Sequence, residues 1–223
     1  MMKLKNSPLL RLFKLKINLA DRERFEKAGM VNLTTSIQQE KGTLAMYSAH
    51  LDEAGTENMV IESYQDEVHY QKHANSAQFK MFSNIASQAV IEKSMINLSP
   101  ELLLEKTTAL HELMPVRVIL KVTSIEIESN KVKEFREASL SAMKRSFENE
   151  AGLLVTYIAS VDGNLNQWVF VEIYRSDEDY QAHLQTMNFK KYATDTEKMV
   201  LNQRIETPIS DVLVNQGGLF FEK

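Results

Sequence analysis

Short runs in which apolar and polar residues alternate recur along the chain, and such alternation predicts β-strands. These runs cover residues 12–18, 43–52, 58–65, 116–123, 153–162 and 167–175. Stretches with helical spacing lie between them: Val132, Phe135, Met143 and Phe147, for example, share one helix face. Further helices are expected from about Asp66 and Asp177, with short helical segments around Phe79 and Phe189. Apolar runs at 102–104 and 212–214 are expected as the closing strands.

Glycines mark two kinds of turn in this pattern. Asp162-Gly163-Asn164 lies between two predicted strands and is a strong signal for a tight hairpin. Gly42 and Gly152 follow the long predicted helices, where a left-handed residue often ends a helix. We therefore expect left-handed backbone at both positions.

The chain repeats itself with an offset of 110 residues. Residues 40–82 align without a gap on residues 150–192, and 13 of the 43 aligned pairs are identical. A period of this length fits a duplicated domain rather than a solenoid unit. The repeat predicts two domains, residues 1–112 and 113–223.

Each copy predicts the element order β-α-β-β-α-β, which is the ferredoxin-like fold of the α+β class. A sheet with helices on one side leaves its other face bare, and a bare apolar face must be covered. We expect the two sheets of the chain to pack on each other as an intramolecular pseudo-dimer. Further association into a homodimer is left open.

Composition excludes several classes of function. The 26 basic and 30 acidic side chains give a net charge of −4, so a nucleic-acid partner is not expected. The sequence has no Cys, which excludes disulfides and thiolate chemistry. No apolar run approaches the roughly 20 residues of a membrane-spanning helix. We therefore expect a cytoplasmic protein without a membrane partner. Phosphate-binding loops, zinc-protease helices and serine-hydrolase elbows have no matching motif.

A set of polar and aromatic residues is shared by both copies and forms the candidate site. Period 2 places alternate residues of the strand at 58–65 on one face, and the equivalent strand does the same. A Tyr and a His three residues apart follow on the next helix, on a common face. The candidate catalytic residues are His183, Tyr180, Tyr174, His73, Tyr70 and Tyr64. The candidate substrate-binding residues are Trp168, Phe170, Glu172, Phe189, Glu62, Phe79 and Asn58.

Aromatic walls with a few converging polar groups suit a small aromatic ligand, and a His could take its phenolic proton. Trp168 aligns with Asn58, so the two sites are not equivalent. The second copy ranks as the likelier site because Trp168 and Phe170 would enlarge its aromatic lining. The shared residues could equally be structural. His50, His69 and His111 have no partner in the other copy and are interpreted as surface residues.

The pattern Glu-x-Gly…Glu-x-Tyr…Tyr-x-x-His…Phe, present from Glu40 to Phe79 and from Glu150 to Phe189, resembles the antibiotic biosynthesis monooxygenase (ABM) domain. The resemblance implies a dimeric α+β barrel, and it implies that Tyr64, Tyr70, Tyr174 and Tyr180 line a substrate cavity. The haem-degrading branch of the family is not favoured, because no His follows Phe79 or Phe189 closely.

This resemblance implies a monooxygenase that joins O2 to a small aromatic or quinol-like molecule without a metal or organic cofactor. Two alternatives remain open at this stage. One is a non-catalytic small-molecule-binding or stress-associated protein with the same fold. The other is a cofactor-free isomerase of a signalling metabolite, which would need a basic phosphate site near the motif.

Overall fold

The computed structural model describes residues 2–114 and 116–223. The first half contains β1 (Met2–Lys3), β2 (Leu9–Ile17), η1 (Leu19–Asp21), α1 (Arg22–Gln39), β3 (Thr43–His50), β4 (Glu57–Tyr64), α2 (Glu67–Ala74), α3 (Ala77–Ala89), β5 (Val90–Glu105) and β6 (His111–Leu113). The second half contains β7 (Ile119–Ile127), η2 (Ser129–Lys131), α4 (Val132–Asn149), β8 (Leu153–Val161), β9 (Asn164–Tyr174), α5 (Asp177–Gln185), α6 (Met187–Thr196), β10 (Val200–Glu206), β11 (Ile209–Asn215) and β12 (Leu219–Glu222).

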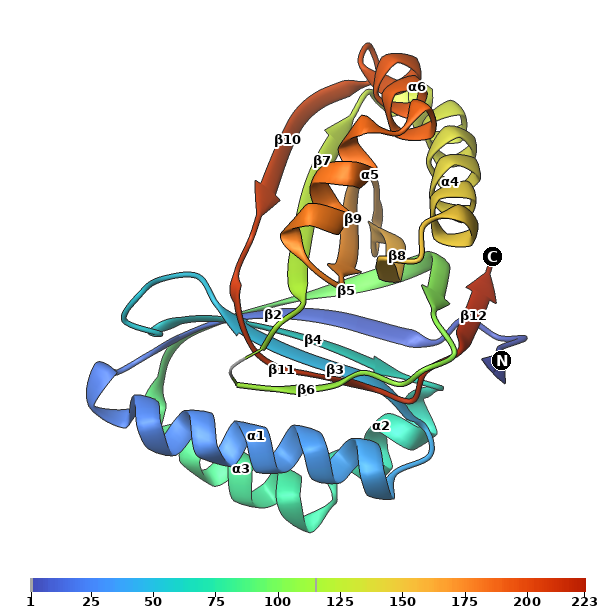
Figure 1. Cartoon of the computed structure of the whole chain (residues 1–223). Helices are drawn as coiled ribbons and strands as arrows, with labels where there is room; N and C mark the ends of the chain where they lie inside the picture. Colours follow the sequence, from blue (N-terminus) through green and yellow to red (C-terminus); the bar gives the residue numbers. More distant parts are fainter. Residues whose placement is uncertain (1, 115) are drawn as a thin grey trace.

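The strands of both halves form one connected sheet. Its order is β10-β7-β9-β8-β5-β2-β4-β3-β11-β6, and β12 joins it beside β5. Helices α1 and α3 cover the sheet of the first half, and α4 and α6 lie over the strands of the second half (Figure 1). This arrangement confirms the predicted pair of tandem ferredoxin-like units in a dimeric α+β barrel.

Two long strand segments pass from one half to the other. The start of β5 pairs with β2, and from Leu98 onward β5 pairs with β8 of the second half. In the same way β10 pairs with β7, while β11 pairs with β3 of the first half (Figure 1). Each half therefore receives a strand that the other half supplies.

This exchange corrects the expected position of the closing strands. The runs at 102–104 and 212–214 do form strands, but they pair across the halves. The closing strand of each ferredoxin-like unit is instead the start of β5 or β10, whose side chains are largely exposed on both faces. An edge strand exposed in this way has no alternating apolar pattern from which it could be predicted.

The bare faces of the two sheets pack on each other, as expected. The shared core takes Tyr47, Met59 and Ile61 from the first half and Val122, Tyr157 and Val171 from the second. Period 2 in β4 leaves the alternate residues Asn58, Val60 and Glu62 on the opposite face, beneath the helices. In the first half, one face of the sheet thus forms the shared core and the other faces the helices.

A small polar cluster lies within this shared core. The Tyr47 and Tyr157 hydroxyls are 3.3 Å apart, Tyr157 donates to Glu105, and Asn215 donates to the Tyr47 hydroxyl. Glu105 and Asn215 occupy equivalent positions in the two halves. The four residues are therefore arranged with pseudo-twofold symmetry, but only Glu105 can carry a negative charge. Burial raises the pKa of Glu105 to about 7.

The hairpin prediction is confirmed, and the prediction for the two helix-end glycines is wrong. Gly163 sits in the turn between β8 and β9 with φ of +74°. Gly42 and Gly152 do not have positive φ. They allow close approach instead: a Cβ at Gly42 would lie 1.9 Å from the His69 ring, and one at Gly152 would lie 2.2 Å from the Asp179 carboxyl.

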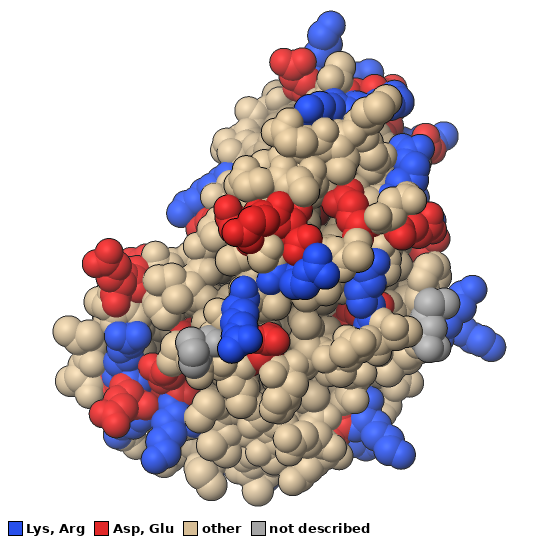
Figure 2. Space-filling model, viewed as in Figure 1, with Lys and Arg blue, Asp and Glu red and all other residues tan. Residues whose placement is uncertain are grey.

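Charged side chains of both signs lie interspersed over the face of the molecule in Figure 2. Among the described residues, no helix combines the length and apolar character needed to cross a membrane.

Candidate functional site

A cavity of about 470 Å³ lies in the first half, between the sheet and its helices. Strands β2, β3, β4, β5 and β11 line its floor, and α1, α2 and α3 line its walls. The apolar lining includes Phe13, Leu15, Phe25, Val60, Phe79, Phe82 and Met95; the polar lining includes Arg22, Glu26, Ser48, His50, Asn58, Glu62, Tyr70, Lys93 and Asp211. Apolar walls with a few polar groups are typical of small-molecule sites, and the volume falls in their usual range.

His50 and Asp211 form a buried pair in this cavity. His50 Nδ1 lies 2.9 Å from Asp211 Oδ1, and the His50 residue is 6% exposed. The interpretation of His50 as a surface residue is therefore wrong. His50 is the last residue of β3, on the same face as Ser48, so the sheet directs it under the helices rather than into solvent.

Asp211 reaches the cavity through the exchanged strand. The register of β11 against β3 shifts between Ser210 and Val212, so Asp211 is the extra residue of a β-bulge. Burial raises the pKa of Asp211, and the neighbouring Glu26 also raises it, while His50 and Arg22 lower it. The pair thus combines a residue of the first copy with one of the second.

Asn58 is the polar neighbour of His50. The two residues are directly opposite each other on β4 and β3, and both line the cavity. The Asn58 Nδ2 atom donates to the Gly55 carbonyl at 3.2 Å. Gly55 has φ of +67° and packs against the Arg22 guanidinium, so no side chain fits there without strain.

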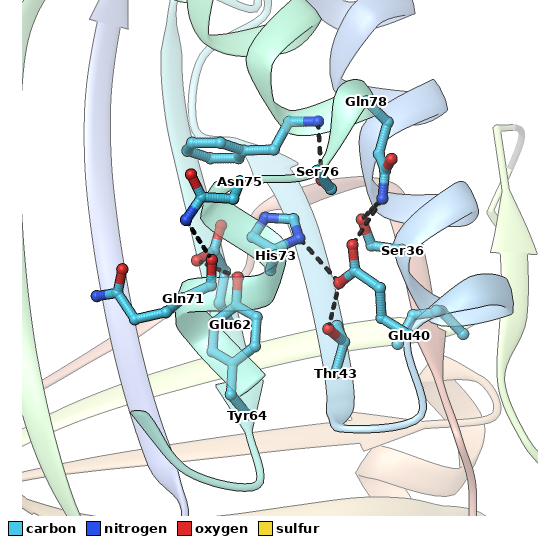
Figure 3. A network of polar contacts seen from close by, with 12 residues as sticks. Ser36, Glu40, Thr43, Glu62, Tyr64, Gln71, His73, Asn75, Ser76 and Gln78 are labelled. Carbon is cyan, nitrogen blue, oxygen red and sulfur yellow. Dashed lines mark hydrogen bonds and ion pairs between the residues drawn. The ribbon is translucent and has the colours of Figure 1, made fainter. Parts of the chain in front are cut away.

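The predicted residues Tyr64 and His73 are buried and belong to a polar network (Figure 3). His73 Nδ1 is 3.1 Å from Glu40 Oε2, and the Tyr64 hydroxyl donates to Glu62 at 2.9 Å. The Glu40 carboxylate also accepts from Thr43 and Gln78. Burial raises the pKa of Glu62, and His73 and the Tyr64 hydroxyl partly offset this rise. Tyr64 and His73 are fully buried and do not line the cavity.

Besides the predicted residue Asn58, three further predicted residues of the first copy line the cavity: Glu62, Tyr70 and Phe79. The Tyr70 ring packs 5.4 Å from Tyr64, with the Arg11 guanidinium 3.9 Å from its centre. Phe79 packs 4.8 Å from the His73 ring. Tyr70 and Phe79 thus connect the cavity wall to the buried network through their contacts with Tyr64 and His73.

The second half repeats the His–Glu and Tyr–Glu contacts of this network. His183 Nδ1 is 2.8 Å from Glu150 Oε2, and the Tyr174 hydroxyl donates to Glu172 at 2.9 Å. The Tyr180 and Phe189 rings lie 5.2 Å from Tyr174 and 4.8 Å from His183, as their counterparts do. Burial raises the pKa of Glu172, and His183 lowers it. These shared contacts are thus a feature of the repeat.

Larger side chains fill the equivalent space of the second half. Trp168 is 2% exposed and packs 5.4 Å from Phe135, and Phe170 belongs to the same apolar cluster. Equivalent pairs in which the first half has the smaller residue include Ser48/Ile158, Asn58/Trp168, Val60/Phe170 and Gly29/Ser139. We expected Trp168 and Phe170 to widen the second site. They occupy its volume instead, because both lie inside the helix–sheet layer.

The remaining histidines do not join the cavity. His69 Nδ1 lies 2.7 Å from Asp66 at the start of α2, and His111 is exposed on β6. Among the described residues, no three His, Asp or Glu side chains gather in a group able to hold a metal ion. The signal that could have identified His50 was the difference between the copies at position 50, whereas a histidine became a candidate only where both copies carry one.

The comparisons with known proteins agree with this description of the fold. A putative monooxygenase from Lactobacillus acidophilus NCFM is 25% identical, with a TM-score of 0.90, and the match covers 97% of this chain and 100% of that one. A putative monooxygenase from Fusobacterium nucleatum subsp. nucleatum ATCC 25586 is 21% identical, with a TM-score of 0.89, covering 99% and 100%. An anthrone oxidase-like protein is 11% identical, with a TM-score of 0.57, covering 96% and 95%. The last two likenesses concern the fold.

No curated protein matches the chain. The sequence model of the family described as antibiotic biosynthesis monooxygenase matches twice, at residues 8–84 and 118–195. These ranges fall on the two ferredoxin-like units and together span more than half of the sequence. The protein therefore belongs to the antibiotic biosynthesis monooxygenase family and carries two copies of its domain in tandem.

Proposed function

We propose that the protein is a cofactor-independent monooxygenase that oxidises a small aromatic hydroxyl compound in the cavity of its first half. The observation that carries this proposal is the buried His50–Asp211 pair in an apolar, aromatic-lined cavity. Membership of the family and the name of the 25% identical relative support monooxygenase chemistry.

His50 is the proposed base. Its Nδ1 faces the Asp211 carboxylate, which can only accept, so the proton resides on Nδ1 and the Nε2 lone pair is free to take a phenolic proton. Asp211 is a positioning residue that holds the ring in this tautomer and stabilises the imidazolium once it forms.

The phenolate that results is electron-rich and can pass one electron to O2. Recombination of the two radicals forms a carbon–oxygen bond at a ring carbon that bears hydrogen. Loss of water then leaves a carbonyl at that carbon. One oxygen atom enters the product, the other leaves as water, and all four electrons come from the substrate. Apolar walls around the ring exclude water from the intermediates.

The repeat supplies an internal control for the assignment of roles. His73 lies in the first half, which has the cavity, and His183 lies in the second half, where larger side chains fill the equivalent space. The two histidines make matching contacts to Glu40 and Glu150. A contact that persists where the equivalent volume is filled is explained by folding alone. His50 and Asp211 have Ser160 and Glu101 at the equivalent positions, and Glu101 is instead held by Arg136 and Lys223.

The test is oxygen consumption with 1-naphthol and 1,4-dihydroxynaphthalene as probes, comparing wild type, His50→Gln and His183→Gln. His50→Gln should lower kcat/KM by roughly 10²- to 10⁴-fold, the usual contribution of a general base. His183→Gln should retain turnover per folded molecule. Tight binding of the probes without oxygen consumption by the wild type would identify a binding protein and reject the monooxygenase.

A further inference from the structure

We infer that the cavity of the first half selects an aromatic ring with two hydroxyl groups on neighbouring carbons. The inference rests on the proposed function in that the ligand is taken to be a small aromatic hydroxyl compound. It adds the pattern of hydroxyl groups, which follows from His50 and Asn58 side by side on adjacent strands.

The first acceptor is His50 Nε2. Among the described residues, the hydrogen bonds of the His50 side chain involve only Nδ1, at 2.9 Å from Asp211. With the proton on Nδ1, Nε2 presents a lone pair. Since His50 lines the cavity, this lone pair is available to a hydroxyl of the ligand.

The second acceptor is Asn58 Oδ1. The amide of Asn58 has one contact in the described part of the chain, to the Gly55 carbonyl. A carbonyl only accepts, so the atom facing Gly55 must be Nδ2, and the oxygen is the atom left without a partner. Asn58 also lines the cavity, which places a second unpaired acceptor there.

The two acceptors belong to a directly opposed cross-strand pair. Side chains of such a pair have Cβ atoms roughly 5 Å apart, so their tips can converge on neighbouring atoms of one ligand. Two converging acceptors require two donors. A ring with adjacent hydroxyls supplies both, whereas a ring with one hydroxyl leaves an acceptor unpaired at a cost.

The next row of side chains along the cavity floor is mainly apolar. Val60 and Phe13 lie opposite each other on β4 and β2, one pleat along from Asn58. Phe25 packs in the same apolar cluster. The ring body fits against this apolar row, while its hydroxyl edge meets His50 and Asn58. Ser48 lies beside Val60 and is the group that a hydroxyl at the far side of the ring would meet.

The second half shows that the fold does not require this acceptor pair. Ser160 and Trp168 occupy the equivalent cross-strand positions. Trp168 Nε1 donates to the Leu165 carbonyl at 2.9 Å, and its ring fills the space. Two acceptors side by side are thus confined to the half that has the cavity.

The experiment is anaerobic titration calorimetry with three probes: 2,3-dihydroxynaphthalene, 2-naphthol and 1,4-dihydroxynaphthalene. The wild type should bind the 2,3-diol about 3- to 10-fold more tightly than 2-naphthol, the effect of one added hydrogen bond. Equal affinity for these two, or tighter binding of the 1,4-diol, would overturn the inference; the latter would assign the second contact to Ser48.

Two variants separate the acceptor from the turn that Asn58 supports. Both Asn58→Leu and Asn58→Asp lose the hydrogen bond to Gly55, but Asp keeps an acceptor oxygen. Asn58→Leu should bind 2-naphthol and the 2,3-diol equally, and Asn58→Asp should restore the preference. Retention of the preference in Asn58→Leu would overturn the inference.

The outcomes also distinguish this inference from the proposed function. Oxygen consumption with naphthols, but without preference for adjacent hydroxyls, rejects only the inference. Absence of binding by all three probes rejects both.

Discussion

Asn58 and Trp168 occupy the same position in the two halves of the barrel. Asn58 lies opposite His50 across β3 and β4, and Trp168 lies opposite Ser160 across β8 and β9. The amide leaves a cavity above the sheet, while the indole closes the equivalent space against Phe135. The size of the side chain at this position therefore strongly affects whether a half has room for a ligand.

Replacing Asn58 by Trp should close the cavity. The indole would take the place that Trp168 takes in the other half, and ligand and indole would compete for one volume. We expect the affinity for 2-naphthol to fall by about 100-fold or more in calorimetry, with the circular dichroism spectrum unchanged. Wild-type affinity in Asn58→Trp would show that the ligand binds elsewhere.

The reverse change, Trp168→Asn, should mainly reduce stability. It empties a packed cluster and removes the hydrogen bond from Trp168 to Leu165. Large-to-small changes of this kind cost about 3–5 kcal/mol in the free energy of unfolding, measured in urea. Asn58→Ala is the matched control, since it loses one hydrogen bond worth roughly 0.5–1.5 kcal/mol and no packed cluster. Similar losses in both variants would contradict the description of one filled and one open half.

His73→Gln and His183→Gln should destabilise the protein to a similar extent. Each removes a buried contact to a glutamate, with distances of 3.1 Å and 2.8 Å. Leaving such groups without a partner costs about 1–3 kcal/mol. Thermal unfolding measures this loss, and oxygen consumption per folded molecule should stay near the wild-type value. A variant of normal stability with lost turnover would assign the network to catalysis instead.

Glu105 should make stability depend on pH. Its pKa is raised from the usual 4.5 to about 7 because the side chain is buried, so the folded protein holds this proton more tightly than the unfolded chain. The free energy of unfolding should therefore fall as the pH rises from 4.5 to 7 and stay low above it. A rise of the pKa from 4.5 to about 7 corresponds to about 3 kcal/mol in the free energy of unfolding.

The comparison that isolates this effect is Glu105→Gln against wild type in urea titrations from pH 4 to pH 8. Gln resembles the protonated carboxyl, so the variant should gain relative stability as the pH rises through this range. Glu53→Gln, at an exposed position, should show the wild-type profile. Parallel pH profiles for Glu105→Gln and wild type would show that Glu105 ionises at its usual pH in the folded protein.

The repeat of 110 residues accounts for most of what could be predicted of the fold. Identical residues at equal spacing fixed two ferredoxin-like units, and bare sheet faces required them to pack together. The exchange of β5 and β11 could not be foreseen, because Leu102–Leu104 has the same local pattern whether it pairs with its own half or with the other. Strand partners are a long-range property.

The site was harder to predict because identity between the copies selects for what both halves need. That criterion found His73, His183, Tyr64 and Tyr174, which hold helices and sheet together in each half. It rejected His50, whose counterpart is Ser160. The contrast of Asn58 with Trp168 was visible in the sequence, but whether a large aromatic lines a cavity or fills it depends on the depth of the layer around it.

Joining both barrel units in one polypeptide has a consequence for how such a protein changes over time. In an assembly of two identical chains, every inherited substitution appears in both units at once. Here a codon that alters one unit leaves its twin untouched, although Asp211 shows that the first unit still uses a residue of the second. One unit is therefore free to acquire new chemistry while its twin preserves the shared scaffold.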